Sequence, residues 1–350
     1  KEQPGSTWLL DFEQEVATWT GKEAAMFVPS GTMAQAIVLC CAQDIHLGGD
    51  RVPSLPRVRR PFLAHPTSHV LLHENEGHKH LLGIQAIPCG KATQPLTCRD
   101  VEAELDASSW GVSQPCAVIL EVPHRELGGE MTSLEEVKAM SALVRGRKVK
   151  FHMDGARIWE AMPYITRTHG LTSQEFCQFF DSVYVSFYKG LGGMTGAVLA
   201  GDKKLIDEAR VWLRRFGGNL YTALPYAVSC QHALHEMGGS FESRWDAMAA
   251  MVTVVQGVDP EKSRIRFTPE TPQTCMVHCH IRGDQHKLEQ CRESVAQETS
   301  LRLFRTLRPS YAFTPDWFYF EFSLGPENTK VPLEDVEHAW RLFLLAVSGP

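Results

Sequence analysis

Short apolar runs recur along the first two thirds of the chain, and amphipathic stretches separate them. Three runs are apolar almost throughout and predict buried strands: 116–122, 149–154 and 182–187. Between the first two runs, residues 133–146 repeat apolar positions at helical spacing and begin with Ser133 and Glu136, a capping-box pattern. Strands that are apolar on both faces and alternate with helices predict a parallel sheet covered by helices, an α/β fold.

The pattern also predicts what precedes and follows these strands. Residues 8–19 repeat apolar side chains at helical spacing. The next segment predicts a strand, a tight turn at 29–32 and a helix over 33–42. Two more apolar runs predict strands at 83–89 and 195–201. A segment rich in Pro, Gly and Arg predicts a loop over 44–61.

A polar, proline-containing segment at 257–272 predicts a boundary between two domains. Long helical patterns at 202–216 and 222–256 precede it. The pattern beyond it predicts a smaller α/β unit, with strands at 274–281 and 317–323 and helices at 284–299 and 332–347. We therefore expect a large domain over 1–256 and a small C-terminal domain over 257–350.

Composition excludes several classes of protein. The chain has 350 residues, a hydrophobic content of 43% and a net charge of -6 without long like-charge blocks, which argues against a nucleic-acid partner. No apolar stretch approaches the roughly 18 residues of a membrane helix, and the first residues lack the apolar core of a signal peptide. Ten irregularly spaced cysteines without a C-x-x-C pair favour a reducing compartment. We expect a cytoplasmic enzyme or binding module.

Two histidine-rich segments raise the question of a metal site. The first is SHVLLHENEGHKH at 68–80, and the second is MVHCHI, which contains His278, Cys279 and His280. Neither has the tight ligand spacing of structural zinc sites. On a strand, alternation sends His278 and His280 to one face and Cys279 to the other. We expect no metal.

Two polar features stand at ends of predicted strands. Ser30, Gly31 and Thr32 form a strand-to-helix turn whose N–H groups, hydroxyls and positive helix end suit a phosphate, although an ordinary N-cap uses the same residues. Asp154 follows an apolar strand, and a buried carboxylate is costly without a cation or a protonated heterocycle. Its alternative role is to cap a helix that begins near Ala156.

Lys189 is the third feature, because it follows an apolar strand and precedes a glycine run. A desolvated lysine loses its proton more easily and suits Schiff-base chemistry, whereas a snorkelling lysine beside a loop is the alternative. A phosphate turn, a carboxylate and a lysine at successive strand ends are together what pyridoxal 5′-phosphate requires. Lys189 would bind its aldehyde and Asp154 would keep its ring nitrogen protonated.

These motifs, in this order, resemble the threonine aldolase and β-eliminating lyase family of fold-type-I pyridoxal phosphate enzymes. The resemblance spans roughly residues 10–220 and rests on five segments: GKEAAMFVPSGTMAQ (21–35), TSHVLLHENEG (67–77), LEVPHRELGGE (120–130), FHMDGARIWEA (151–161) and YKGLGGMTGAVLAGD (188–202). It implies a large domain around a mixed, mostly parallel sheet and a smaller C-terminal domain. It also implies homodimers or homotetramers with active sites at subunit interfaces.

The resemblance further implies roles for individual residues. Carried over by position, Gly31 and Thr32 bind the phosphate, His69 stacks on the pyridine ring, Asp154 pairs with the ring nitrogen, Lys189 is the Schiff-base lysine, Arg157 holds the cofactor or the substrate carboxylate, and His124 lies at the edge of the site. The implied reaction cleaves the Cα–Cβ bond of a threonine-like β-hydroxy-α-amino acid into glycine and an aldehyde. His69 is the first candidate for the base and His124 the second.

Two other functions stay open at this point. One is β-elimination with the same cofactor, which releases pyruvate and ammonia from serine or cysteine derivatives. The other is a catalytically silent relative that acts as a binding module.

The chain also departs from the family pattern. Family members carry an N-terminal arm before the first helix, and this chain begins almost at that helix, so the arm is either cut away or absent. Tyr188 replaces the serine before the Schiff-base lysine, and Tyr221 replaces an arginine. The strand at 317–323 lacks the family's arginine for the substrate carboxylate. Four arginines are candidate substitutes: Arg125, Arg157, Arg214 and Arg215.

Overall fold

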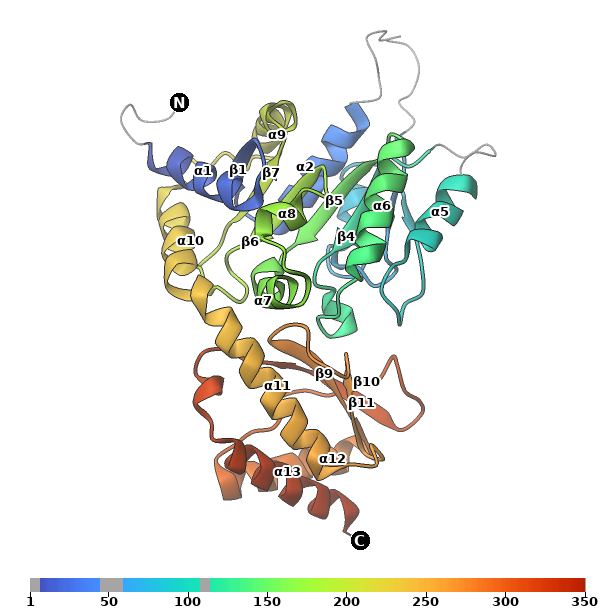
Figure 1. Ribbon diagram of the computed structural model, residues 1–350, viewed down its shortest axis with the longest axis vertical. Helices are drawn as coiled ribbons and strands as arrows, with labels where there is room; N and C mark the ends of the chain where they lie inside the picture. Colours follow the sequence, from blue (N-terminus) through green and yellow to red (C-terminus); the bar gives the residue numbers. More distant parts are fainter. Residues whose placement is uncertain (1–6, 45–58, 108–113, 350) are drawn as a thin grey trace. The chain divides into compact units, whose positions relative to one another are not determined.

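The computed structural model describes residues 7–44, 59–107 and 114–349 (Figure 1). The chain forms two compact units, one of residues up to His124 with 131–239 and one of 125–130 with the residues from Ser240 onward. Sequence analysis placed the boundary at 256/257, whereas the structure has it near 239/240. The difference is helix α11 (Phe241–Val258), whose apolar side chains belong to the core of the second unit. The first six residues and most of the predicted loop at 44–61 lie outside the described residues.

The first unit is built on a sheet with the strand order β1-β7-β6-β5-β4-β2-β3. Its strands are β1 (Ala24–Val28), β2 (Phe62–Ala64), β3 (Ala86–Pro88), β4 (Ala117–Glu121), β5 (Lys150–Gly155), β6 (Ser182–Ser186) and β7 (Ala197–Gly201). Strands β2 to β6 pair in parallel, and β7 is antiparallel to β6 and β1. The predicted α/β fold with a mixed, mostly parallel sheet is confirmed.

Helices lie on both sides of this sheet (Figure 1). The longer ones are α1 (Trp8–Thr20), α2 (Gly31–Asp44), α5 (Cys98–Ala107), α6 (Leu134–Gly146), α7 (Ile158–His169), α9 (Lys203–Arg215) and α10 (Leu224–Met237); the short ones are α3 (His69–Leu72), α4 (Gly77–His80) and α8 (Ser173–Cys177). Apolar side chains of α2 and α9 pack with those of β1, β6 and β7 in one buried cluster. Burial on both faces explains why the central strands are apolar throughout.

The predicted cap of α6 is half confirmed. Ser133 Oγ accepts a hydrogen bond from Glu136 N at 3.3 Å, as a helix N-cap does. The Glu136 carboxylate, however, accepts from Cys98 N at 2.5 Å and so ties α6 to the start of α5. A complete capping box occurs instead at Thr172 and Glu175, where it starts α8.

The second unit has a four-stranded antiparallel sheet in the order β10-β11-β9-β8. Its strands are β8 (Ile265–Thr268), β9 (Met276–Arg282), β10 (Arg308–Pro309) and β11 (Trp317–Ser323), and its helices are α11, α12 (Gln285–Thr299) and α13 (Leu333–Ser348). Cys279 faces the apolar core, while His278 and His280 contact Tyr311 and Tyr319. The predicted alternation along this strand is therefore confirmed.

Two features of this region differ from the predicted pattern. The segment 257–272, predicted as a boundary between domains, contains β8, in which buried Ile265 and Phe267 alternate with exposed Arg266. The single helix predicted over 222–256 is interrupted by a 3₁₀ turn at Gly238–Ser240, which separates α10 from α11. No helix in the described part of the chain is long and apolar enough to cross a membrane.

Candidate active site

The carboxyl ends of the parallel strands β4, β5 and β6 meet at one edge of the sheet, where open α/β folds bind ligands. Register places Asp154 of β5 beside Glu121 of β4 on one side and Tyr184 of β6 on the other. Strand β7 runs the opposite way, so its first residue pairs with the last residue of β6 and with the last residue of β1. The predicted phosphate turn and the Lys189 segment therefore leave the sheet at this same edge.

Gly31 begins α2 and is packed closely against Tyr184. A Cβ added at Gly31 would lie 1.9 Å from the Tyr184 hydroxyl oxygen, so no other residue fits without movement. Ser30 Oγ accepts a hydrogen bond from Met33 N at 3.3 Å, which is the N-cap role considered as an alternative. Thr32 is exposed at the first turn of this 14-residue helix, whose N–H groups and positive end suit an anion.

Asp154 is a deeply buried acid at this edge, with 2% of its surface exposed. Its Oδ1 accepts a hydrogen bond from Ala156 N at 3.2 Å. The pKa of Asp154 is raised to about 7, chiefly by burial and then by the Glu121 carboxylate, while His69 opposes the shift. The helix cap proposed as an alternative does not form, because α7 begins at Ile158 with Arg157 in the N-cap position. The position favours a cationic partner for the carboxylate.

His69 is held at this edge by two carboxylates. Its backbone N donates to Glu121 Oε2 at 2.8 Å, and its ring Nδ1 lies 3.1 Å from Glu74 Oε1. The hydrogen bond to Glu74 raises the pKa of His69, burial opposes the rise, and the negative charge of Asp154 reinforces it. Sequence analysis missed both glutamates. Glu121 had a detectable signal, a charged residue at the end of an apolar run.

Lys189 follows β6 in a half-buried loop that is linked to the phosphate turn. Its Nζ lies 5.8 Å from the centre of the Tyr188 ring, and its carbonyl accepts from Gly192 N at 2.9 Å. Farther along the loop, Thr195 Oγ1 donates to Pro29 O at 3.0 Å. The Tyr188 hydroxyl lies 3.2 Å from that of Tyr184, so the tyrosine at the family's serine position joins the group beside Gly31.

His124 and Arg157 have well-defined partners. His124 is buried after β4, with Nε2 2.9 Å from Thr67 Oγ1 and its ring edge-to-face against His65 at 4.5 Å. Arg157 Nη1 donates to Glu160 Oε1 at 3.0 Å, and that carboxylate is buried. The first unit therefore contains all the predicted site residues.

The arginines considered as carboxylate clamps differ in position. Arg125 belongs to the second unit, where Nε pairs with Glu321 at 2.9 Å and Nη1 with Glu126 at 2.8 Å. Arg215 lies at the end of α9 over the ring of Trp212. Sequence analysis missed Arg308 on β10, which hydrogen-bonds Tyr319 of the arginine-free strand β11 and whose pKa is raised by that bond. A strand of two residues has no periodic pattern that sequence analysis could detect.

The donor set fits pyridoxal 5′-phosphate on three counts. Gly31 opens the start of α2 for an anion, and the buried Asp154 carboxylate suits a protonated ring nitrogen. Lys189 supplies an amine at the same sheet edge. Among the described residues, no group of three or more His, Cys, Asp or Glu side chains is placed to hold a metal ion.

Comparisons with known proteins agree with the fold. The sequence profile of the family described as "Beta-eliminating lyase" matches residues 3–280. The chain is 30% identical over 284 residues to "Probable low-specificity L-threonine aldolase 2" of Arabidopsis thaliana, which covers 79% of this chain and 73% of that protein. It is 29% identical over 226 residues to "Low-specificity L-threonine aldolase" of Candida albicans, covering 64% of this chain and 56% of that protein.

A crystal structure of a putative L-allo-threonine aldolase from Listeria monocytogenes matches with a TM-score of 0.86 and 30% identity, covering 98% of this chain and 87% of that one. A serine palmitoyltransferase of Sphingomonas wittichii matches with a TM-score of 0.68 at 15% identity, covering 97% of this chain and 76% of that one, and shares the fold. The sheet and its site define a fold-type-I α/β enzyme. The chain belongs to the β-eliminating lyase family, as the sequence motifs indicated.

Proposed function

We propose that this protein is a pyridoxal phosphate-dependent lyase that cleaves threonine-like β-hydroxy-α-amino acids into glycine and an aldehyde. The observation that supports it best is the buried Asp154 carboxylate at a sheet edge shared with Gly31 and the Lys189 loop. The relatives named as threonine aldolases support this reaction over others of the same fold.

The cofactor supplies an electron sink for the electron pair left when the Cα–Cβ bond breaks. The residues of this chain bind and tune it. Lys189 would supply the amine for its aldehyde, and Ser30, Gly31 and Thr32 would hold its phosphate at the start of α2. The buried Asp154 carboxylate would stabilise a proton on the ring nitrogen. Arg157 binds the cofactor or the substrate carboxylate.

Cleavage also needs a base that removes the proton of the β-hydroxyl group. His69 and His124 are the candidates, since a neutral imidazole has a nitrogen lone pair that accepts a proton. The hydrogen bond between Glu74 and Nδ1 of His69 fixes the orientation of the imidazole ring, which suits the ring-stacking role that the family resemblance implies. The proton leaves the hydroxyl as the aldehyde forms, and a proton returned to Cα completes glycine, so the reaction needs no other reagent.

Product analysis tests the proposal. The cofactor-loaded protein is incubated with L-threonine, L-allo-threonine, L-serine and the D-threonine isomers, and glycine, aldehyde and pyruvate are measured. Glycine and aldehyde in equal amounts support aldol cleavage, pyruvate indicates β-elimination, and no product from any substrate contradicts both. Lys189→Ala should abolish the absorption band of covalently bound cofactor, and an unchanged band would contradict the lysine assignment.

We further infer a homodimer or homotetramer in the cytoplasm, acting on a small-molecule amino acid without a nucleic-acid or membrane partner. Five exposed apolar residues support self-association: Met194, Leu220, Tyr221, Leu224 and Val228. We call these five residues the α10 patch, because they lie on α10 or in the loops before it. All ten cysteines are free thiols and nine are buried, which fits a reducing compartment.

A further inference from the structure

Three side chains, those of His65, Thr67 and His124, lie within hydrogen-bonding distance of one another in sequence: His65 contacts Thr67, and Thr67 contacts His124. His65 Nε2 lies 2.8 Å from Lys91 O and 2.9 Å from Gln94 O. A carbonyl oxygen only accepts hydrogen bonds, so Nε2 of His65 must carry a hydrogen. His65 has 2% of its surface exposed, and burial and the nearby His124 lower its pKa, so its ring is neutral near pH 7.

In a neutral imidazole with a hydrogen on Nε2, the other nitrogen has a lone pair. Nδ1 of His65 therefore accepts hydrogen bonds, and its two neighbours are Thr67 N at 3.2 Å and Thr67 Oγ1 at 3.0 Å. The Thr67 hydroxyl has one hydrogen and two ring nitrogens within reach, because His124 Nε2 lies 2.9 Å away on its other side.

The hydroxyl hydrogen has two possible positions, and they differ in energy. If it pointed to His124, Nδ1 of His65 would keep only the 3.2 Å hydrogen bond from Thr67 N, and Thr67 Oγ1 would lie 3.0 Å from that nitrogen without a hydrogen between them. If it points to His65, both contacts are satisfied, provided that His124 donates from Nε2 to Thr67. The second arrangement is favoured because it leaves no buried acceptor facing another acceptor.

We infer that His65 and Thr67 are positioning residues that set the tautomer of His124, with the hydrogen on Nε2 and the lone pair on Nδ1. Among the described residues, Nδ1 of His124 has no hydrogen-bond partner. His124 therefore has its lone pair ready to accept a proton, and the resulting imidazolium remains hydrogen-bonded through Nε2. This tautomer makes His124 a better candidate for the base than His69. That role in catalysis rests on the proposed function.

Thr67→Val removes the hydroxyl at nearly constant volume, and Thr67→Ser keeps it as the matched control. The tautomer of His124 is measured by ¹⁵N NMR of histidine-labelled protein, and its signals are assigned by their loss in His124→Asn. We expect Nε2–H in the wild type and in Thr67→Ser, and a shift toward Nδ1–H in Thr67→Val. A wild-type protein with Nδ1–H, or an unchanged tautomer in Thr67→Val, overturns the inference.

A second pair of variants covers the case in which Thr67→Val does not fold. His65→Asn keeps an acceptor near the place of Nδ1, whereas His65→Gln places its amide near the place of Nε2. His65→Asn should keep the tautomer of His124, and His65→Gln should disturb it. If the two variants behave alike, the hydrogen-bonded relay from His65 through Thr67 to His124 is contradicted.

Activity is the second measurement. Thr67→Val should lower kcat about 10-fold or more, with a smaller change in KM, because the base loses its preferred tautomer. Thr67→Ser should recover most of the loss. If the NMR result holds and no variant or wild-type protein releases glycine, the proposed function fails while the relay stands.

Discussion

The Asp154 side chain is almost completely shielded from water at the sheet edge. It is buried beside Glu121, and its pKa rises to about 7 because burial disfavours its charge. Two adjacent acids at the end of an apolar sheet are unfavourable without a cation. In the proposed function the protonated ring of the cofactor would supply that cation, so we attribute this arrangement to cofactor binding rather than to stability.

Asp154→Asn tests this attribution. A raised pKa means that the folded protein holds this proton more tightly than the unfolded chain, so the free energy of unfolding falls as pH rises from about 4 to about 7. In cofactor-free protein, the substitution should remove that part of the pH dependence, measured by urea denaturation at pH 5 and pH 7.5. It should also weaken cofactor binding. Asp207→Asn, at an exposed acid on α9, is the control and should change neither.

Glu74→Gln tests the cause of the His69 shift. The hydrogen bond to the Glu74 carboxylate raises the pKa of His69, so the amide should lower that pKa toward its ordinary value. His69 stabilises the fold fully below its unfolded pKa and loses this contribution as pH rises through the folded pKa; the variant should lose it at lower pH. NMR titration of His69 measures the pKa. Glu76→Gln, which removes an exposed carboxylate beside Lys79 and His80, should leave the pKa unchanged.

At the scale of elements, the start of α2 depends on the absence of a side chain at Gly31. A Cβ there would meet the hydroxyl and the ring of Tyr184, which is buried between the sheet and α2. Gly31→Ala should therefore destabilise the protein by about 1–3 kcal/mol, as overpacking does, and weaken cofactor binding. Urea denaturation and a cofactor titration measure the two effects.

Gly146→Ala is the matched control for that change. Gly146 ends α6, and an added Cβ there would meet nothing within 4 Å. Alanine in a helix is favoured over glycine by up to about 1 kcal/mol, so this variant should be as stable as the wild type or more stable. Equal effects of Gly31→Ala and Gly146→Ala would show that Tyr184 moves aside freely and that the close packing is unimportant.

The elements that sequence analysis found are those that are buried on both faces. Strands β4, β5 and β6 lie within one residue of the predicted ranges, because continuous burial requires continuous apolar sequence. Strand β2, with three residues, and β10, with two, are too short to produce a period. Strand β8 was not predicted, because only Ile265 and Phe267 in this polar segment are buried.

The candidate site was predictable only where a residue stands at the end of a recognisable strand. Asp154 and Lys189 meet that condition, and Glu121 did as well, although sequence analysis overlooked it. Glu74, His65 and Thr67 do not, because they reach the site through the irregular chain around the four-residue helix α3. Their partners follow from how that segment folds against β4, which no local pattern shows.

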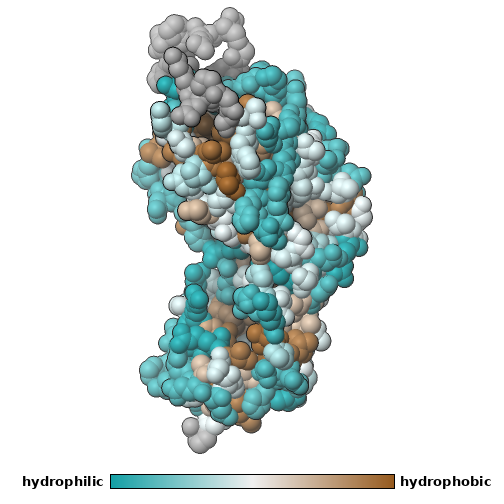
Figure 2. All heavy atoms as spheres, turned by 90° about the vertical axis from the view of Figure 1, so that its left-hand side faces the viewer, coloured by the Kyte–Doolittle hydropathy of each residue, from teal (hydrophilic) through white to brown (hydrophobic). Residues whose placement is uncertain are grey.

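At the scale of the whole molecule, the surface of the first unit exposes several large apolar side chains. The side on which α1 and α10 lie faces the viewer in Figure 2, which shows brown side chains exposed among teal ones. The α10 patch includes Tyr221, which is 98% exposed, and Met194, whose backbone N donates to Ser229 Oγ on α10 at 3.0 Å. We propose that these exposed apolar groups belong to a surface for self-association.

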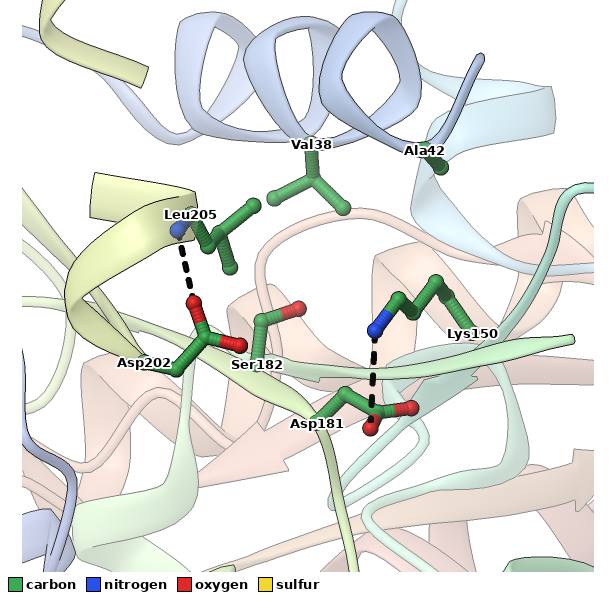
Figure 3. A pocket seen from close by; sticks show the side chains of 7 residues that line it. All are labelled: Val38, Ala42, Lys150, Asp181, Ser182, Asp202 and Leu205. Atoms are coloured by element: carbon green, nitrogen blue, oxygen red, sulfur yellow. Dashed lines mark hydrogen bonds and ion pairs between the residues drawn. The ribbon is translucent and has the colours of Figure 1, made fainter. Parts of the chain in front are cut away.

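A small hollow at the opposite edge of the same sheet has a structural rather than a ligand-binding role. It lies among Val38, Ala42 and Leu205 and the polar residues Lys150, Asp181, Ser182 and Asp202 (Figure 3). Its carboxylates already have structural partners, since Asp202 caps α9 through Leu205 N and Asp181 accepts from Phe151 N. The hollow stands at the amino ends of β5 and β6, away from the edge that binds ligands in such folds.

Tyr221→Glu tests whether the α10 patch joins two copies of the chain. A charge placed in an apolar contact must lose its hydration when the contact forms, so the variant should shift the protein toward the mass of a single chain. Light scattering coupled to size-exclusion chromatography measures that mass at several concentrations. Leu345→Glu, at a residue 71% exposed on α13 of the second unit, is the control and should leave the mass unchanged. If Tyr221→Glu keeps the wild-type mass, or if the wild type is itself a single chain, the α10 patch does not serve self-association. A lower mass together with a loss of aldehyde release would show that activity depends on assembly.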